Sequence, residues 1–136
     1  MAGQRTPASG SLGERAVVIS QGDVFWVHLP RPQGSEPGYG VVVQNNVVNR
    51  TRINTVVVCG LIWNLSGASS PGNVVLRRGE ANLPQASVVD VSQIFTLDKS
   101  QLGNRLGTLS PERVREILAG ITFLLEPREP PPTGET

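Results

Sequence analysis

Short runs of β-branched and aromatic residues, each bounded by Gly, Pro, Asn or Ser, recur along the middle of this chain. Such side chains favour extended backbone, and their borders favour turns. Strands are therefore predicted at residues 24–29, 41–44, 55–60, 73–76 and 87–97. Runs such as Val56-Val57-Val58 do not alternate with polar residues, so both faces of the sheet should be covered. The pattern predicts an antiparallel sheet curled into a small barrel, which leaves few exposed edges.

One helix is predicted after the last strand. Ser110 suits the N-cap, Pro111 suits the first turn, and Pro127 ends the pattern. Apolar residues recur between them at helical spacing, and we expect this stripe to pack on the sheet. The stripe consists of Val114, Ile117, Leu118, Ile121, Leu124 and Leu125. A weaker pattern predicts a short helical turn within residues 45–52. The predicted fold class is mainly β with a C-terminal helix.

Length and composition limit the domain organisation. A chain of 136 residues holds one ordinary domain. Residues 1–20 are predicted to be a flexible tail, residues 21–126 the folded domain, and residues 127–136 a disordered Pro-rich tail. No apolar run reaches the roughly 18 residues that span a membrane, and no secretory signal is visible. The expected location is the cytoplasm, with no membrane partner.

Charge and metal-ligand content narrow the chemistry. The net charge is +1, so a polyanion would be attracted only by local clusters such as Arg50 with Arg52. Cys59 and His28 are each the only residue of their type, and His28 has no ligand companions nearby in the sequence. We therefore expect no metal site and no cofactor.

Residues 30–40 are expected to form a long loop after the first strand. The segment holds the guanidinium of Arg31, the hydroxyl of Ser35, the carboxylate of Glu36 and the ring of Tyr39. Such groups can grip and cleave a phosphodiester, with Glu36 as a general base or as the partner of an arginine. The alternative is a solvated turn in which Ser35 caps the backbone.

Several short motifs follow one another in a fixed order along residues 21–125. They are Gly22-Asp23-Val24-Phe25-Trp26-Val27, Gly34-Ser35-Glu36, Ser87-Val88-Val89, Gln93-Ile94 and Asp98-Lys99. Together they resemble the MazF/PemK family of toxins. The resemblance implies an SH3-like small β-barrel of the MazF, PemK and CcdB type and a homodimer. It also implies the toxin of a type II toxin-antitoxin system, with an antitoxin partner that blocks it and metal-independent endoribonuclease cleavage of single-stranded RNA.

The sequence departs from the family at two catalytic positions. Tyr39-Gly40-Val41-Val42 occupies the place of an Arg-Pro pair in a segment that is a few residues shorter, and Ile62 occupies the place of a threonine. Loss of one transition-state donor typically costs about a hundredfold to a thousandfold in rate. Three explanations stay open. Catalysis is lost and the domain is a module that binds antitoxin, RNA or protein; other residues compensate; or the shortened segment reflects engineering or an omitted stretch.

The compensation hypothesis, base stacking on aromatic rings and the family resemblance together supply the candidate site residues. The catalytic candidates are Glu36 and Ser35, with Ile62 at the threonine position and Ser66 as another hydroxyl. The RNA-binding candidates are Arg31, Tyr39, Arg50, Arg52, Trp63, Ser92 and Gln93. Trp63 has two interpretations, an anchor in the core or dimer interface and a platform on which a base stacks.

Overall fold

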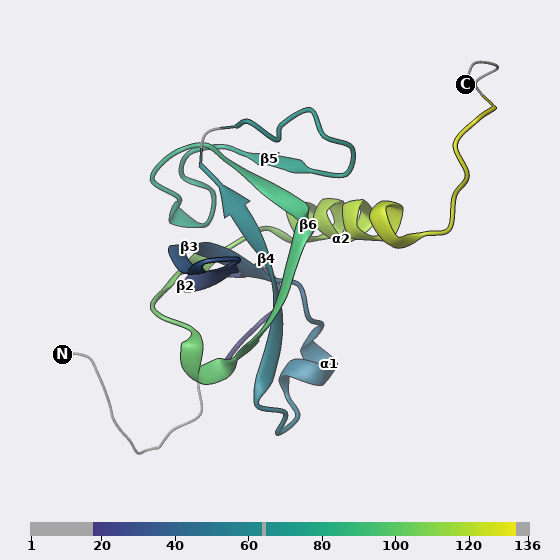
Figure 1. The fold of residues 1–136 in the computed structure, drawn as a ribbon. Helices are drawn as coiled ribbons and strands as arrows, with labels where there is room; N and C mark the ends of the chain where they lie inside the picture. Colours follow the sequence, from purple (N-terminus) through teal and green to yellow (C-terminus); the bar gives the residue numbers. More distant parts are fainter. Residues whose placement is uncertain (1–17, 64, 133–136) are drawn as a thin grey trace.

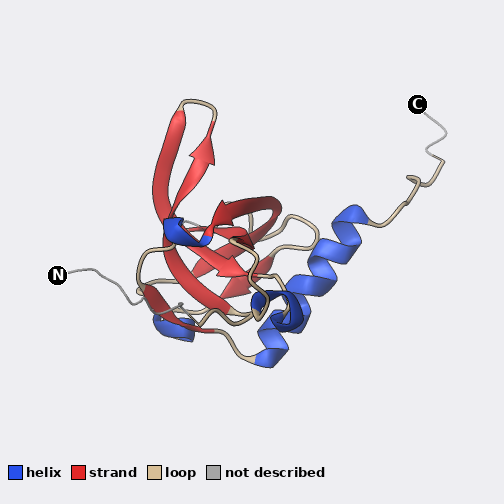
Figure 2. Cartoon of the chain, turned by 90° about the horizontal axis from the view of Figure 1, so that it is seen from below, coloured by secondary structure: helices blue, strands red, loops and turns tan. Residues whose placement is uncertain are grey.

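A single antiparallel sheet forms the body of the protein in the computed structural model, which describes residues 18–63 and 65–132. The strands are β2 (Asp23–Arg31), β3 (Gly34–Val42), β4 (Thr55–Ile62), β5 (Val74–Leu76), β6 (Ser87–Asp98) and β7 (Arg105–Thr108), in the spatial order β5-β6-β4-β3-β2-β7. Figure 2 shows the strands curling around a shared interior. The sheet is barrel-like but open, because β5 and β7 remain at its edges.

Three short helices and one long one complete the fold (Figure 1). They are α1 (Asn46–Asn49), η1 (Glu80–Asn82), η2 (Lys99–Gln101) and α2 (Pro111–Leu125). The mainly β fold with a C-terminal helix is thus as predicted, and α1 lies within the predicted helical turn. No helix among the described residues has the length and apolar character needed to cross a membrane. The predictions for residues 1–17 of the N-terminal tail and 133–136 of the C-terminal tail fall outside the described residues.

Apolar residues are buried on both faces of the sheet, as the non-alternating runs predict. The cluster on the α2 side contains Val24, Val41, Cys59, Leu61, Val74, Leu76, Leu83, Val89, Leu109 and Ile117. The cluster on the other side contains Ile19, Phe25, Val27, Leu29, Val42, Val56, Val58 and Leu97. Burial, with the nearby charge of Asp90, raises the pKa of the Cys59 thiol to about 12. Cys59 is therefore a packed core residue that stays protonated.

The helix α2 approaches the sheet closely through glycine. Its N-cap Ser110 accepts a hydrogen bond from the backbone N–H of Arg113. Ile117 is buried, and Gly120 packs directly against Gly72, where an added Cβ would lie 2.0 Å from the Gly72 carbonyl oxygen. Two residues without side chains thus let the helix backbone touch the loop before β5.

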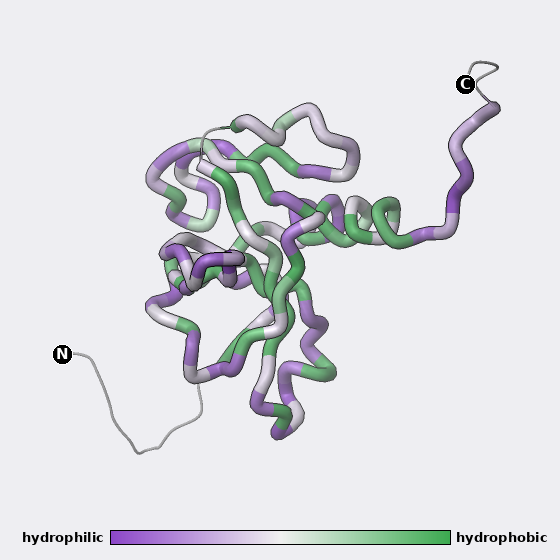
Figure 3. The backbone as a smooth tube through the Cα atoms, viewed as in Figure 1, coloured by the Kyte–Doolittle hydropathy of each residue, from purple (hydrophilic) through white to green (hydrophobic). Residues whose placement is uncertain are grey.

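The prediction that the whole apolar stripe of α2 packs on the sheet is wrong at its end. Leu124 is exposed, and Leu125 is 67% exposed. Figure 1 shows the last turns of α2 running out beyond the strands, and Figure 3 shows that this outer part stays largely hydrophobic. The helix carries more apolar surface than the sheet can cover.

The predicted loop at residues 30–40 is also wrong, because those residues form a β-hairpin. The strands β2 and β3 pair without interruption from Val24 opposite Val41 to Arg31 opposite Gly34. The connection is closed by Pro32 and Gln33 alone. The shortened segment is thus a complete hairpin with a tight turn.

Candidate functional site

An ion pair lies at the tip of the β2–β3 hairpin. Arg31 Nε donates to Glu36 Oε1 at 2.7 Å. Glu36 lies opposite Leu29 in the pairing register, and Arg31 is two residues further along β2 on the same face. The Glu36 side chain is 61% exposed, so the carboxylate is accessible from solvent. A proton acceptor thus lies beside a permanent positive charge. Ser35 is exposed at the same tip, opposite Pro30.

A bulge in β6 brings a third side chain to this ion pair. Pairing between β4 and β6 jumps from Cys59 opposite Ile94 to Leu61 opposite Val89, so the β6 residues between them leave the ladder. The side chain of Gln93, from this bulge, covers Gly60. Gly60 leaves room for it because it has no side chain, and a Cβ added there would lie 3.0 Å from Gln93 Oε1. Arg31 Nη1 donates to this oxygen at 3.3 Å.

Asp90 fixes the orientation of the Gln93 amide. Gln93 Nε2 donates to Asp90 Oδ2 at 3.2 Å, which turns Oε1 toward Arg31. The other carboxylate oxygen accepts from the backbone N–H of Ser92 at 3.0 Å and from its hydroxyl at 2.6 Å. We call Asp90, Gln93, Arg31 and Glu36 the hairpin-tip cluster. Sequence reasoning missed Asp90, because the run around it reads as one continuous strand and gives no sign of the bulge that brings it to Gln93.

Ile62 lies near the hairpin-tip cluster but adds no polar group to it. It pairs with Val88 and follows Gly60 by two residues, which places it on the face of β4 that Gln93 covers. An isoleucine neither donates nor accepts a hydrogen bond. The cluster therefore has a carboxylate and a guanidinium but no hydroxyl from this position.

Arg50 and Arg52 lie at the other end of β4, before its first residue, whereas Gly60 is near its last. The intervening strand is long enough to separate them by roughly 20 Å at about 3.3 Å per residue. Arg50 donates to the backbone oxygen of Ile19 and to Ser20 Oγ, the latter at 3.0 Å. Arg50 therefore holds the residues before β2, and the structure does not bring either arginine to the hairpin-tip cluster.

Three aromatic rings form a row across the hairpin and the end of β4. The Tyr39 ring meets the Trp26 ring edge-on at 5.0 Å between centroids, and meets the Trp63 ring edge-on at 5.4 Å. Trp26 follows Val24 by two residues and Tyr39 precedes Val41 by two, so both rings lie on the sheet face of the cluster on the α2 side. Tyr39 and Trp63 therefore lie on the opposite sheet face from the hairpin-tip cluster, and Trp26 joins them as a residue that the sequence reasoning did not single out.

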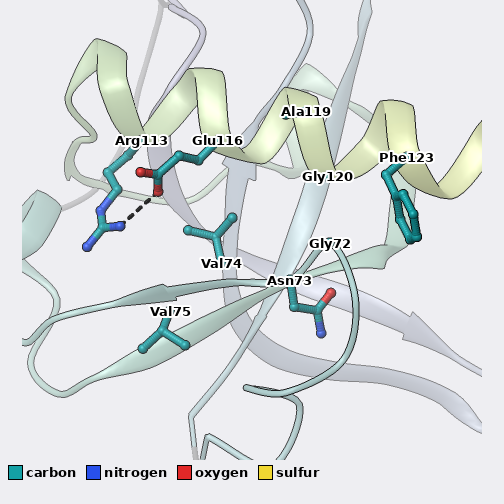
Figure 4. Close-up of a pocket in the computed structure, with 9 residues that line it drawn as sticks. All are labelled: Gly72, Asn73, Val74, Val75, Arg113, Glu116, Ala119, Gly120 and Phe123. Carbon is teal, nitrogen blue, oxygen red and sulfur yellow. Dashed lines mark hydrogen bonds and ion pairs between the residues drawn. The ribbon is translucent and has the colours of Figure 1, made fainter.

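A groove with a volume of about 610 Å³ lies between β5 and α2 (Figure 4). Its charged side chains are Arg113 and Glu116, whose Nη1 and Oε1 atoms are 2.8 Å apart. Arg113 also donates through Nε and Nη2 to the two carboxylate oxygens of Glu80, at 2.9 Å each. This hydrogen bonding lowers the pKa of Glu80. The Glu80 side chain is only 25% exposed, against 61% for Glu36, and two carboxylates share the one guanidinium of Arg113. The groove is therefore less suited to acid–base chemistry than the hairpin-tip cluster.

Both a family model and individual proteins match the sequence of this chain over most of its length. The family model described as "PemK-like, MazF-like toxin of type II toxin-antitoxin system" matches residues 20–125. Endoribonuclease MazF6 of Mycobacterium tuberculosis is 34% identical over 113 residues, which are 81% of this chain and 99% of that protein. Endoribonuclease MazF of Staphylococcus saprophyticus is 32% identical over 111 residues, which are 79% of this chain and 92% of that protein.

Solved structures share the fold. A mycobacterial endoribonuclease in complex with its cognate antitoxin superposes with a TM-score of 0.65 at 23% identity, covering 82% of this chain and 99% of that one. MazF from Deinococcus radiodurans superposes with a TM-score of 0.64 at 18% identity, covering 81% and 98%. The open, barrel-like sheet with its C-terminal helix is thus the fold of MazF toxins. The chain belongs to the PemK/MazF family of type II toxin-antitoxin endoribonuclease toxins.

Proposed function

We propose that this protein is the toxin of a type II toxin-antitoxin system and cleaves single-stranded RNA without a metal ion, through the hairpin-tip cluster. The observation that carries the proposal is the contact of 2.7 Å between Arg31 and the exposed carboxylate of Glu36. The relatives at 34% and 32% identity are named endoribonucleases, which supports the same reaction class here.

The chemistry follows from the two charged groups. Glu36 accepts the proton of a ribose 2′-hydroxyl while that oxygen attacks the adjacent phosphorus. Arg31 donates hydrogen bonds to the phosphate oxygens as negative charge builds up on them. The bond from phosphorus to the 5′ oxygen then breaks, the leaving oxygen takes a proton from water, and a cyclic phosphate remains. Gln93 and Asp90 keep the guanidinium in place, and both are within hydrogen-bond reach in the chain Asp90–Gln93–Arg31.

We further propose which of the other candidates contact RNA. Gln93 contacts Arg31, and Ser92 precedes it in the bulge, so both would contact the nucleotides flanking the cleaved bond. Tyr39 and Trp63 would bind bases where the strand passes to the other face of the hairpin. Arg52 is exposed and would contact a more distant phosphate, whereas Arg50 serves the fold.

The protein partners in this proposal are a cognate antitoxin and a second copy of this chain, and the site of action is the cytoplasm, where messenger RNA is translated. The exposed apolar end of α2, with Phe123, Leu124 and Leu125, supports the homodimer. Burial of such side chains is worth about 1.5–3 kcal/mol each, which favours a protein surface over solvent.

A second candidate function rests on the residues at the family's catalytic positions. Ile62 supplies no hydroxyl, and β3 carries Tyr39-Gly40-Val41-Val42 where the family has an Arg-Pro pair. A family member that binds antitoxin, RNA or another protein without cleaving RNA would have this composition. The two candidates differ in whether Glu36 has a chemical role.

One set of cleavage assays separates them. The full-length protein, Glu36→Gln, Ile62→Thr and the charge-matched control Glu112→Gln are each incubated with a long single-stranded RNA in chelator. We expect slow cleavage by the unaltered protein and by the control, a loss of about 10²- to 10⁴-fold in Glu36→Gln, and faster cleavage by Ile62→Thr. Equal rates for Glu36→Gln and the unaltered protein would refute the role of Glu36. Intact RNA with every protein would favour the binding module.

Ile62→Thr is a better repair than restoring the Arg-Pro pair by substitution. Gly40 lies near the end of β3, where it pairs with Phe25 of β2 on one side and Gly60 of β4 on the other. An added Cβ there would lie 3.3 Å from Val58 Cγ2, and proline would also remove a backbone donor from a central strand. Such a variant would test the fold rather than the chemistry.

A further inference from the structure

A pocket of about 360 Å³ opens beside the edge strand β7, away from the hairpin-tip cluster. It is lined by Trp26, Tyr39, Asn104, Arg105 and Leu106. Its volume is within the range of about 300–1,000 Å³ that is typical of small-molecule sites. The lining combines aromatic rings, a guanidinium and a carboxamide.

The aromatic wall of this pocket is both exposed and held in place. Trp26 is 39% exposed, although its strand neighbours Phe25 and Val27 are buried. The register places Tyr39 directly opposite Trp26, and their rings meet edge-on at an interplanar angle of 74°. On the far side, Tyr39 contacts Trp63 in the same way. The Trp26 ring thus has a fixed position and keeps surface for a planar group to stack on.

The polar wall is attached to the same strand. The backbone N–H of Trp26 donates to the backbone carbonyl of Asn104 at 2.9 Å, and the backbone N–H of Gly103 donates to the backbone carbonyl of Trp26 at 2.7 Å. The residues that follow are therefore fixed beside the indole. The Asn104 side chain is exposed and makes no hydrogen bond within the described parts of the chain. Its amide offers both a donor and an acceptor, as the edge of a nucleobase requires.

Arg105 supplies a positive charge with donors to spare. Arg105 Nη1 lies 3.3 Å from the buried Asp23 Oδ2, and the Arg105 side chain is 52% exposed. Asp23 also accepts from Thr108 Oγ1 at 2.6 Å and from Ser20 N–H at 2.9 Å, so Arg105 is one of three partners for that carboxylate. A guanidinium has five N–H donors, and most of those on Arg105 remain available to an anion such as a phosphate.

We propose that this pocket binds one unpaired nucleobase of single-stranded RNA, stacked on Trp26, with Asn104 at the base edge and Arg105 on the adjacent phosphate. The proposal rests on the RNA binding described under the proposed function and adds a base-binding subsite to it. An aromatic face, a two-way hydrogen-bonding amide and a guanidinium together match a nucleotide better than an apolar peptide segment.

The test uses 2′-O-methyl oligonucleotides, which have no free 2′-hydroxyl to react, and the full-length protein. The affinity of Trp26→Leu is compared with that of the unaltered protein, and Trp26→Phe keeps an aromatic ring if leucine disturbs the fold. We expect roughly 10- to 100-fold weaker binding by Trp26→Leu, as stacking on one aromatic ring predicts, and a smaller loss with phenylalanine.

Two further measurements identify the base and the phosphate. An abasic site moved along the oligonucleotide should weaken binding to the unaltered protein at one position, and the same lesion should have no effect on Trp26→Leu. Arg105→Gln should reduce the slope of log affinity against log salt by about 0.7, as expected for one phosphate of a single strand. Variant Glu112→Gln serves as the control for a changed charge at a residue that does not line the pocket.

The outcomes separate this proposal from the one it rests on. Oligonucleotide binding that is equally strong in Trp26→Leu and in the unaltered protein refutes base binding in this pocket but leaves the proposed function standing. Absence of binding by any single-stranded oligonucleotide overturns both. If the fluorescence of Trp26, measured in Trp63→Phe, shifts with protein concentration and not with oligonucleotide, a second copy covers the indole and the base-binding assignment fails.

Discussion

Substitution of Gly120 by alanine tests the closest contact between α2 and the sheet. In an exposed helix this change stabilises by about 1 kcal/mol, because alanine loses less backbone entropy than glycine. Here the added Cβ would lie 2.0 Å from the Gly72 carbonyl oxygen and 3.1 Å from Val91 Cγ1. The first distance is more than about 1 Å short of van der Waals contact. Either α2 or the loop before β5 must move.

Movement of the loop is restricted, because Gly72 has a φ of +88° and is already in a conformation that favours glycine. Overpacking of this kind typically costs about 1–3 kcal/mol, and a shift of α2 would also loosen the packing of buried Ile117. We expect Gly120→Ala to lower the free energy of unfolding by about 1–3 kcal/mol. For a domain of this size that corresponds to a fall in Tm of roughly 4 °C or more.

The neighbouring residue provides a matched control. Ala119 is exposed, so Ala119→Gly should cost only the helix-propensity difference of about 1 kcal/mol. Propensity alone predicts opposite signs for the two variants, whereas the contact with Gly72 predicts that both are destabilised. Thermal and urea unfolding of the two proteins measure this directly. A Gly120→Ala protein as stable as the unaltered chain, or more stable, would refute the close approach.

Three other changes have defined outcomes. Asp90→Asn should turn the Gln93 amide so that its NH₂ group faces the guanidinium of Arg31. Loss of about 1.5–3 kcal/mol of charge-assisted hydrogen bonding should then slow RNA cleavage by roughly 10- to 100-fold without unfolding the protein. An unchanged rate would argue against the hydrogen-bonded chain Asp90–Gln93–Arg31. In the folded protein the pKa of Glu80 is below its ordinary value of 4.5, mainly because Arg113 donates hydrogen bonds to its carboxylate. The contribution of Glu80 to stability is therefore complete above the unfolded pKa and is lost as the pH falls through the folded pKa, so the urea midpoint of Glu80→Gln should change less than that of the unaltered protein between about pH 3 and pH 7. The same pH dependence in both proteins would contradict this. Leu125→Glu should shift the protein toward monomer in light scattering at constant concentration, and an unchanged mass would remove this end of α2 from the dimer interface.

The sequence predicts most of the fold because the signals for it are local. The β-branched runs and the Ser110 cap depend on neighbouring residues only, and β4, β5, β6 and α2 lie where the runs indicate. The hairpin strand β3 has the opposite character, since it contains Gly38, Pro37 and Gly40. Pro37 is tolerated because β4 pairs with β3 only from Gly40 onward, which leaves that stretch with β2 as its one neighbour.

The candidate site was predictable in its residues but not in its contacts. Arg31 and Glu36 stand out as charged residues in a short segment, yet their contact depends on the hairpin register. The link from Gln93 to Asp90 depends on a bulge in β6. Asp90 and Ser92 favour turns, but they stand within a largely apolar run that reads as one continuous strand. Arg50 is predicted to bind RNA because it lies near another arginine in the sequence. In the structure it donates instead to the backbone oxygen of Ile19, a contact that no local pattern indicates.

The buried thiol in the middle of β4 has a practical consequence. Cys59 is the only cysteine of the chain, it is fully enclosed, and its pKa of about 12 keeps it from forming the reactive thiolate at neutral pH. A cysteine introduced at an exposed position should therefore be the only one that a maleimide or a spin label modifies, with the native residue left in place. Distances between labels on the hairpin and on α2 could then be followed in solution as RNA, antitoxin or a second copy is added.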